Sequence, residues 1–174
     1  MAHRQQFEFV ESVKNKYPDH FCKTKVLEVG SLDINGSVRQ FFTDCDYIGI
    51  DLGEGKGVDV VCQGQEYDAP ADTFDTIISC ECFEHNPDWV LTFVNMYRMT
   101  KPGGLIIMSC ATTGRGEHGT RRTSPQDAPF CGDYYMNLTE QDFVERFKLE
   151  DMFSTFQFSI GHQTCDLYFY GIKK

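Results

Sequence analysis

Val26-Leu27-Glu28-Val29-Gly30 is a short apolar run that ends in an acid and a glycine, and it decides the fold. A second run, Tyr47-Ile48-Gly49-Ile50, ends about twenty residues later in Asp51. Acids and glycines at the tips of successive strands are typical of a doubly wound sheet that holds a nucleoside. The glycine allows a ligand to approach the backbone. The Asp51 carboxylate can accept hydrogen bonds from two ribose hydroxyls.

Strand-like runs recur along most of the chain. Two of them, 151–160 and 166–172, are expected to form a closing hairpin around Gly161. Five others are expected to be parallel strands, over residues 25–30, 46–50, 58–61, 74–79 and 105–110. The fold class is therefore α/β: a Rossmann-like, doubly wound sheet of seven strands, mostly parallel with an antiparallel C-terminal hairpin strand, and with helices on both faces.

Apolar residues at helical spacing predict helices between these strands. The first covers residues 6–17. A second begins near Asn86, a good cap, with Pro87 in the first turn, and runs to about Met99. A capping box predicts a third over 139–147. The residues of the second helix expected to face the core are Val90, Phe93, Val94 and Tyr97.

The length of 174 residues indicates one domain, 1–174. We divide it into an N-terminal helix (1–24), a core that carries the strand-tip motifs (25–110), a long loop (111–137), and a helix with the closing hairpin (138–174). The loop lacks clear periodicity, and loops of this length are usually functional or disordered.

Charge and composition narrow the partners. The net charge of −10 disfavours nucleic acid, whose binders usually carry a basic surface. No apolar run is long enough to span a membrane, and the first residues lack a signal-peptide core. The eight cysteines show no small-scaffold spacing and are interpreted as reduced thiols. These features indicate a cytoplasmic protein without nucleic acid or membrane partners, and they leave its oligomeric state open.

Five motifs in order resemble the class I S-adenosylmethionine-dependent methyltransferases, and the small methyltransferase-domain type most of all. The resemblance covers about residues 24–110. The motifs are Val26-Leu27-Glu28-Val29-Gly30, Gly49-Ile50-Asp51, Phe74-Asp75-Thr76-Ile77-Ile78-Ser79, Phe83-Glu84-His85 and Lys101-Pro102-Gly103-Gly104.

The resemblance implies that the chain binds S-adenosyl-L-methionine and releases S-adenosyl-L-homocysteine. It places Glu28 and Gly30 beside the methionine part of the cofactor and Asp51 on the ribose. The residues that it implies bind the cofactor are Glu28, Gly30, Ser31, Asp51, Leu52, Gln63, Gly64, Cys80 and Glu81. Two departures stand out: the first motif lacks alternating glycines after Gly30, and Gln63 replaces the usual acid at the adenine edge.

Charge supports the same cofactor independently of the family. A sulfonium is a cation, so carboxylates around it are favourable. A dinucleotide would require a Gly-x-Gly-x-x-Gly spacing, which is absent, and Glu28 would lie unfavourably beside a pyrophosphate.

Two histidines are candidate catalytic residues. His85 follows the fourth predicted strand, where a base could reach an acceptor, and a histidine hydrogen-bonded at a helix start is an equal alternative. His118 lies in the long loop. Cys80, Cys82, Glu84 and His85 contain metal-ligand types, but their spacing matches no structural zinc pattern and we expect no metal.

The loop is also expected to bind the acceptor. Arg115, Arg121 and Arg122 would clamp an acidic group, with Tyr135 as a further contact. A solvated, mobile loop is the alternative.

The expected function is methyl transfer to an oxygen or nitrogen atom of a small-molecule or saccharide-type acceptor, and the loop arginines favour an acidic one. Two alternatives stay open. One is a non-catalytic S-adenosylmethionine-binding module that partners or regulates another protein. The other is an NAD-dependent oxidoreductase on the same general fold.

Overall fold

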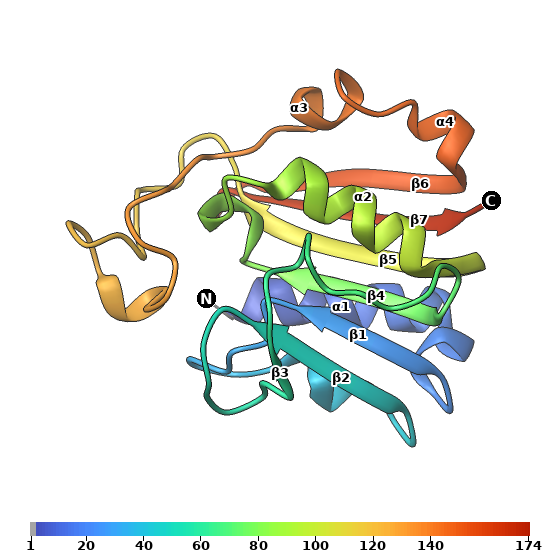
Figure 1. The fold of residues 1–174 in the computed structure, drawn as a ribbon. Coiled ribbons are helices and arrows are strands. Elements are labelled where there is room, and N and C mark those ends of the chain that lie inside the picture. The colour runs from blue at the N-terminus through green and yellow to red at the C-terminus, as the bar shows by residue number, and fades with distance from the viewer. Residues whose placement is uncertain (1–2) are drawn as a thin grey trace.

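A computed structural model describes residues 3–174 as one seven-stranded sheet with helices on both faces (Figure 1). The strand order is β3-β2-β1-β4-β5-β7-β6. β7 runs antiparallel to both neighbours, and the other pairs are parallel, so the expected fold class is confirmed. The strands are β1 (Lys25–Val29), β2 (Asp46–Asp51), β3 (Val60–Val61), β4 (Phe74–Cys80), β5 (Thr100–Ala111), β6 (Phe153–Gly161) and β7 (Asp166–Lys173).

The helices divide between the two faces of the sheet. α1 (Arg4–Lys16) covers one face, and α2 (Trp89–Met99) crosses the other (Figure 1). The remaining helical segments are short: η1 (Pro18–Phe21), η2 (Val38–Phe41), η3 (Phe83–His85), η4 (Pro125–Asp127), α3 (Glu140–Val144) and α4 (Leu149–Met152). Within residues 3–174, no helix combines the length and apolar character needed to cross a bilayer.

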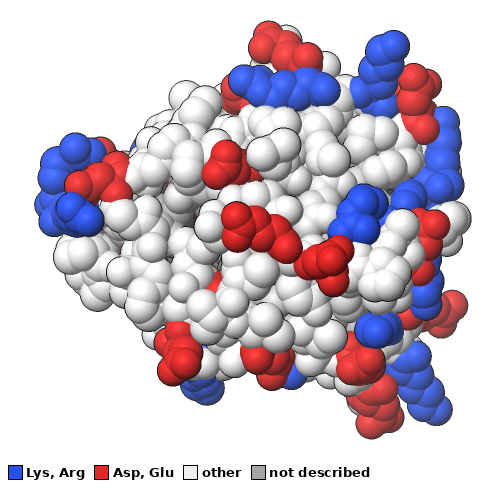
Figure 2. Space-filling view, viewed as in Figure 1, with Lys and Arg blue, Asp and Glu red and all other residues white. Residues whose placement is uncertain are grey.

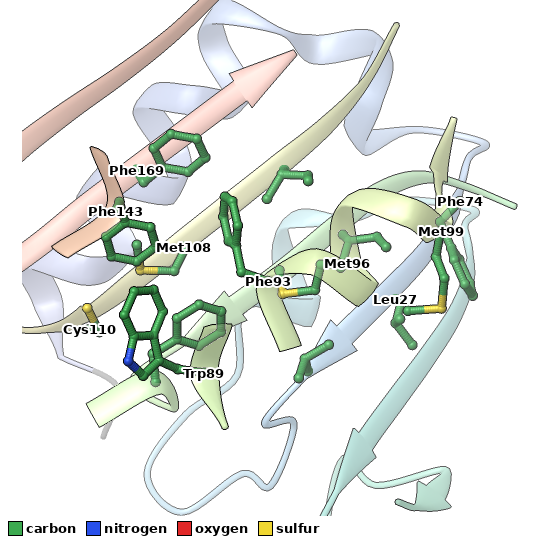
Figure 3. Close-up of a cluster of buried hydrophobic side chains, with 14 of the residues drawn as sticks. Leu27, Phe74, Trp89, Phe93, Met96, Met99, Met108, Cys110, Phe143 and Phe169 are labelled. Atoms are coloured by element: carbon green, nitrogen blue, oxygen red, sulfur yellow. The ribbon is translucent and has the colours of Figure 1, made fainter. Parts of the chain in front are cut away.

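Each face of the sheet has its own apolar core. Successive side chains of a strand point to opposite faces, so Leu27 packs with α2 and Val26 packs with α1. The same alternation divides β5 between the two cores. Figure 3 shows the α2 side, where aromatic and methionine side chains interdigitate above the strands. Burial on both faces explains why the parallel strands are nearly continuous apolar runs.

The predicted inward face of α2 is wrong at Val94, which is 47% exposed. With 3.6 residues per turn, the residue after Phe93 points about 100° away from it. Val90 and Tyr97 are partly buried against the core, as expected. The helix buries its apolar side through Trp89, Phe93, Met96 and Met99.

Several helices and strands begin or end at residues other than those predicted, and local hydrogen bonds explain part of the difference. Asn86 caps a turn rather than the helix, because its side-chain oxygen accepts the Asp88 N–H at 2.8 Å and α2 begins after it. The capping box of α3 is confirmed, with the Thr139 N–H and hydroxyl donating to Asp142 at 2.8 and 2.7 Å. Residues 149–152 form α4, so the closing hairpin begins later than predicted.

Candidate functional site

A cavity of about 670 Å³ opens at the carboxyl ends of the parallel strands. It lies where the strand order reverses between β1 and β4, which is where open α/β sheets bind their ligands. All nine predicted cofactor-binding residues line it, although they come from four separate segments: Glu28, Gly30, Ser31, Asp51, Leu52, Gln63, Gly64, Cys80 and Glu81.

Glu28 is a buried acid in the cavity wall. It is 4% exposed, and the Tyr47 hydroxyl donates to its Oε2 at 2.8 Å. Burial raises the pKa of Glu28 to about 8, against the effect of the Tyr47 hydrogen bond. A cation placed beside this carboxyl would favour its ionised form, so the wall is suited to a positively charged ligand.

Asp51 is held in place by backbone donors from two loops. Its Oδ2 accepts the Leu32 N–H at 3.0 Å, and its Oδ1 accepts the Leu52 N–H at 2.7 Å. A carboxylate has about four lone-pair sites, so the group keeps acceptor capacity for a ligand hydroxyl beside its backbone donors. A pair of neighbouring hydroxyls fits this fixed acceptor.

The structure explains why the first motif has a glycine at position 30. Its φ of +80° is one that side chains rarely adopt, and an added Cβ would lie 2.6 Å from Cys82 Cβ. The chain needs glycine here because the β1 and β4 tips pack closely, which is a different reason from the ligand approach that the sequence suggested. Beyond this turn, Asp33 pairs with Lys56 at 2.6 Å and accepts the Gly36 N–H at 2.6 Å.

Part of the cavity wall is apolar. Four large hydrophobic side chains that are at least 40% exposed line it: Ile34, Leu52, Val61 and Phe130. Gly64 in this wall packs against α2, whose Asn95 donates to the Gly64 carbonyl at 2.9 Å. Exposed apolar side chains around a cavity are suited to a flat apolar ring.

The tip of β4 carries a second buried acid. Glu81 has a φ of +52°, and its Oε1 accepts the Ser109 hydroxyl at 2.9 Å. Arg115 Nη2 lies 4.0 Å from Glu81 Oε2. Burial raises the pKa of the Cys80 thiol to about 12, so this cysteine is a neutral packed group.

These features agree with the comparisons to known proteins. A family model described as "Methyltransferase domain" matches residues 3–163. The chain belongs to the methyltransferase-domain family. No curated protein matches it in sequence.

Solved structures of methyltransferases share the fold. A phosphoethanolamine N-methyltransferase from Haemonchus contortus, in complex with S-adenosyl-L-methionine, aligns over 95% of this chain at 15% identity and a TM-score of 0.68. A 1,6-didemethyltoxoflavin-N1-methyltransferase from Burkholderia thailandensis aligns over 100% of this chain and 92% of its own, at 16% identity and a TM-score of 0.62. The CurJ carbon methyltransferase aligns over 94% of this chain at 14% identity and a TM-score of 0.63. The chain spans about half, 52%, of the first and third of these proteins.

The loop of this methyltransferase domain brings three predicted residues together. The rings of His85 and His118 lie 5.0 Å apart between centroids, and the Tyr135 ring lies 5.5 and 5.1 Å from them. His85 lines the cavity. Burial lowers the pKa of His85 to about 3, which makes it a weak base at neutral pH.

The three arginines do not form one clamp. Arg115 is inside the domain, donating to Asp166 at 3.0 Å and to the Thr164 carbonyl at 2.7 Å. Arg121 and Arg122 are 81% and 67% exposed and are not among the cavity residues. They pair with Asp133 and Glu117, and Figure 2 shows basic and acidic side chains gathered at that end of the molecule. Both exposed arginines therefore already pair with acids of the same loop.

Sequence reasoning missed two buried contributors. Gln6 of α1 lines the cavity at 2% exposure, and its Oε1 has no partner among the described residues. The spacing of Gln6 with Val10 and Val13 puts all three on one helix face, and this signal could have found it. Glu84, which the sequence placed in a family motif and in a local set of metal-ligand types but not among the site residues, is fully buried beside His85.

Proposed function

We propose that this methyltransferase domain binds S-adenosyl-L-methionine in the 670 Å³ cavity and methylates an oxygen or nitrogen atom of a small-molecule acceptor. The observation that carries the proposal is the meeting of Glu28 and Asp51, from different strands, in one cavity whose wall also holds exposed apolar side chains. The volume falls within the range of about 300–1,000 Å³ that is usual for small-molecule sites.

The residues present fit each part of that cofactor. Glu28 offers negative charge to the cationic methionine end, and Asp51 offers fixed acceptors to the ribose. Leu52 and Val61 offer apolar surface to the adenine. Two buried oxygens that line the cavity, Ser31 Oγ and Gln6 Oε1, have no partner within residues 3–174 and can bind the polar methionine groups.

When bound, the cofactor supplies a methyl group on a positively charged sulfur. The domain's own task is to align the acceptor with that methyl group and to exclude water. Residues 127–131 of the loop also line the cavity, so they can contact a bound ligand. The structural neighbours include N- and C-methyltransferases, so the acceptors tested must offer both kinds of atom as well as oxygen.

The test is turnover by the purified chain. S-adenosyl-L-homocysteine release would be measured with a panel of hydroxyl, amine, carboxylate and carbon acceptors. Asp51→Asn is expected to abolish release, and Asp46→Asn, at the exposed start of the same strand, is expected to leave it unchanged. Binding of the cofactor without turnover on any acceptor would instead indicate the non-catalytic binding module. Preferential NAD binding would indicate the oxidoreductase.

A further inference from the structure

Three ligand-type side chains converge at the edge of the cavity, and none of them is among the nine predicted cofactor-binding residues. Glu84 and His85 belong to η3 after β4, and His118 comes from the loop after β5. One ligand atom from each lies within 4.8 Å of the others. Their exposed fractions are 0, 4 and 8%, so all three are removed from solvent. The carboxylate and two imidazoles thus share one buried volume.

The polar atoms of this cluster lack partners. Both Glu84 carboxylate oxygens, His85 Nδ1 and His118 Nε2 have no hydrogen-bond partner among the described residues. The Tyr135 hydroxyl beside them has none either. Buried polar groups are nearly always hydrogen-bonded, and leaving a carboxylate unpaired in the interior is costly. Several unpaired atoms meeting at one point indicate a group that binds them together.

The surrounding backbone holds the cluster in a ligand-like arrangement. His118 Nδ1 lies 3.0 Å from the Gly116 carbonyl, and a proton on Nδ1 would leave Nε2 with its lone pair toward Glu84 and His85. Metal-binding histidines are usually fixed in this way. The Met136 N–H donates to the Glu84 carbonyl at 2.9 Å, which ties the segment of Tyr135 to η3.

Gly119 lets the loop close over the cluster. Its φ is +65°, and an added Cβ would lie 2.6 Å from His85 Cε1. Only glycine allows the backbone next to His118 to pack this closely on the His85 ring.

We propose that Glu84, His85 and His118 bind one divalent transition-metal ion at the edge of the cavity. Two imidazoles and one carboxylate suit zinc, manganese, iron(II) or cobalt(II), and they suit magnesium or calcium poorly. His85 also lines the cavity, so an open coordination position there can take an oxygen of the acceptor. This role rests on the proposed function, whereas metal binding itself does not. A metal ion in this position favours acceptors with a hydroxyl or carboxylate oxygen.

A second cluster of the same kind does not qualify. His3, Glu81 and Asp166 also bring ligand atoms within 4.8 Å of one another. Its acids are already engaged, because Asp166 pairs with Arg115 at 3.0 Å and Glu81 accepts the Ser109 hydroxyl. In the Glu84 cluster, by contrast, neither carboxylate oxygen has a hydrogen-bond partner within residues 3–174.

The test is metal binding by the tag-free chain after treatment with a chelator. Zinc, manganese, cobalt and magnesium ions would each be titrated by calorimetry, and the cobalt form would be followed by its visible absorption spectrum. We expect one equivalent of a transition metal to bind and magnesium to bind far more weakly. His118→Ala and Glu84→Gln are each expected to weaken binding by at least about 100-fold, beyond the usual 10–100-fold cost of losing an outer partner.

Controls separate this site from other sources of binding. His162→Ala and Glu150→Gln change the same residue types at exposed positions and should leave the affinity unchanged. Circular dichroism identifies any variant that fails to fold. If Glu84→Gln fails to fold, the His118→Ala titration decides. Absence of transition-metal binding, or binding that survives His118→Ala, would overturn the proposal.

The cofactor is titrated on the same metal-free protein. Cofactor binding without metal binding would refute the metal site alone. Metal binding without cofactor binding would refute the proposed function alone.

Discussion

Cofactor binding is expected to depend on pH through Glu28, and Glu28→Gln is the variant that removes the dependence. Burial raises the pKa of this carboxyl to about 8. A cation beside Glu28 favours the ionised form, so below pH 8 the carboxyl must lose its proton when the cofactor binds. Affinity therefore rises with pH and levels off above the pKa.

The magnitude follows from the fraction of Glu28 that is ionised. With a pKa of about 8, roughly 1 molecule in 100 is ionised at pH 6 and about half at pH 8. The affinity for S-adenosyl-L-methionine should then rise about 50-fold over this interval, or about 2 kcal/mol. Glu28→Gln carries no proton to lose and should show none of this gain.

Calorimetric titration at pH 6, 7, 8 and 9 measures the effect. The cofactor's own amino group titrates near pH 8 and contributes equally with both proteins. The ratio of wild-type to Glu28→Gln affinity therefore isolates Glu28. A ratio that stays flat from pH 6 to pH 9 would refute the assignment of Glu28 to the cationic part of the ligand.

Three further predictions concern stability, each measured by chemical denaturation without cofactor. The folded pKa of Glu28, about 8, lies above the ordinary 4.5, so the stability of the wild-type protein falls as pH rises between these two values. Glu28→Gln should therefore become more stable relative to wild type toward pH 8, and an unchanged difference in unfolding free energy would contradict the burial effect. Gly30→Ala should cost more than Gly103→Ala, since both have positive φ but a Cβ at Gly103 meets nothing within 4 Å; equal costs would exclude the clash with the β4 tip. Phe93→Ala should cost about 3–5 kcal/mol and Val94→Ala less than about 0.5; similar losses would contradict the observed face of α2.

The strand-tip half of the site was predictable because its signals are local. An apolar run of five or six residues reports a buried parallel strand, and the residue after it must lie at the ligand edge of the sheet. Glu28 and Asp51 needed no further information to be placed in one cavity. Gly30 was found as well, although its main reason is the close approach of Cys82 rather than of a ligand.

The loop half could not be read in the same way. His118 lies 33 residues after His85 in the sequence (118 − 85), in a segment without periodicity, so nothing local reports that they meet. Arg115 and Arg121 look alike in sequence, yet one pairs with a buried acid and the other with an exposed one. Tertiary pairing decides such cases, and a single sequence does not contain it.

Val94 shows a limit of reading helix faces. It is apolar and adjacent to Phe93, and both fit a loosely drawn apolar stripe. The core admits only the residues that meet the sheet, and these include the polar Thr92 and Asn95. Asn95 is buried because its side-chain amide donates to the Gly64 and Tyr67 carbonyls at 2.9 and 3.0 Å. These two hydrogen bonds explain why a polar residue occupies a buried position of the helix.

Calorimetric titration of the purified chain with S-adenosyl-L-methionine and S-adenosyl-L-homocysteine tests the central claim most directly. Wild type and Asp46→Asn should bind both sulfur nucleosides, and Asp51→Asn should lose most of that affinity because the ribose acceptor is changed. NAD serves as the anionic control and should bind weakly to all three proteins. Absence of sulfur-nucleoside binding, or equal binding by Asp51→Asn and wild type, would contradict the assignment of this cavity to the cofactor.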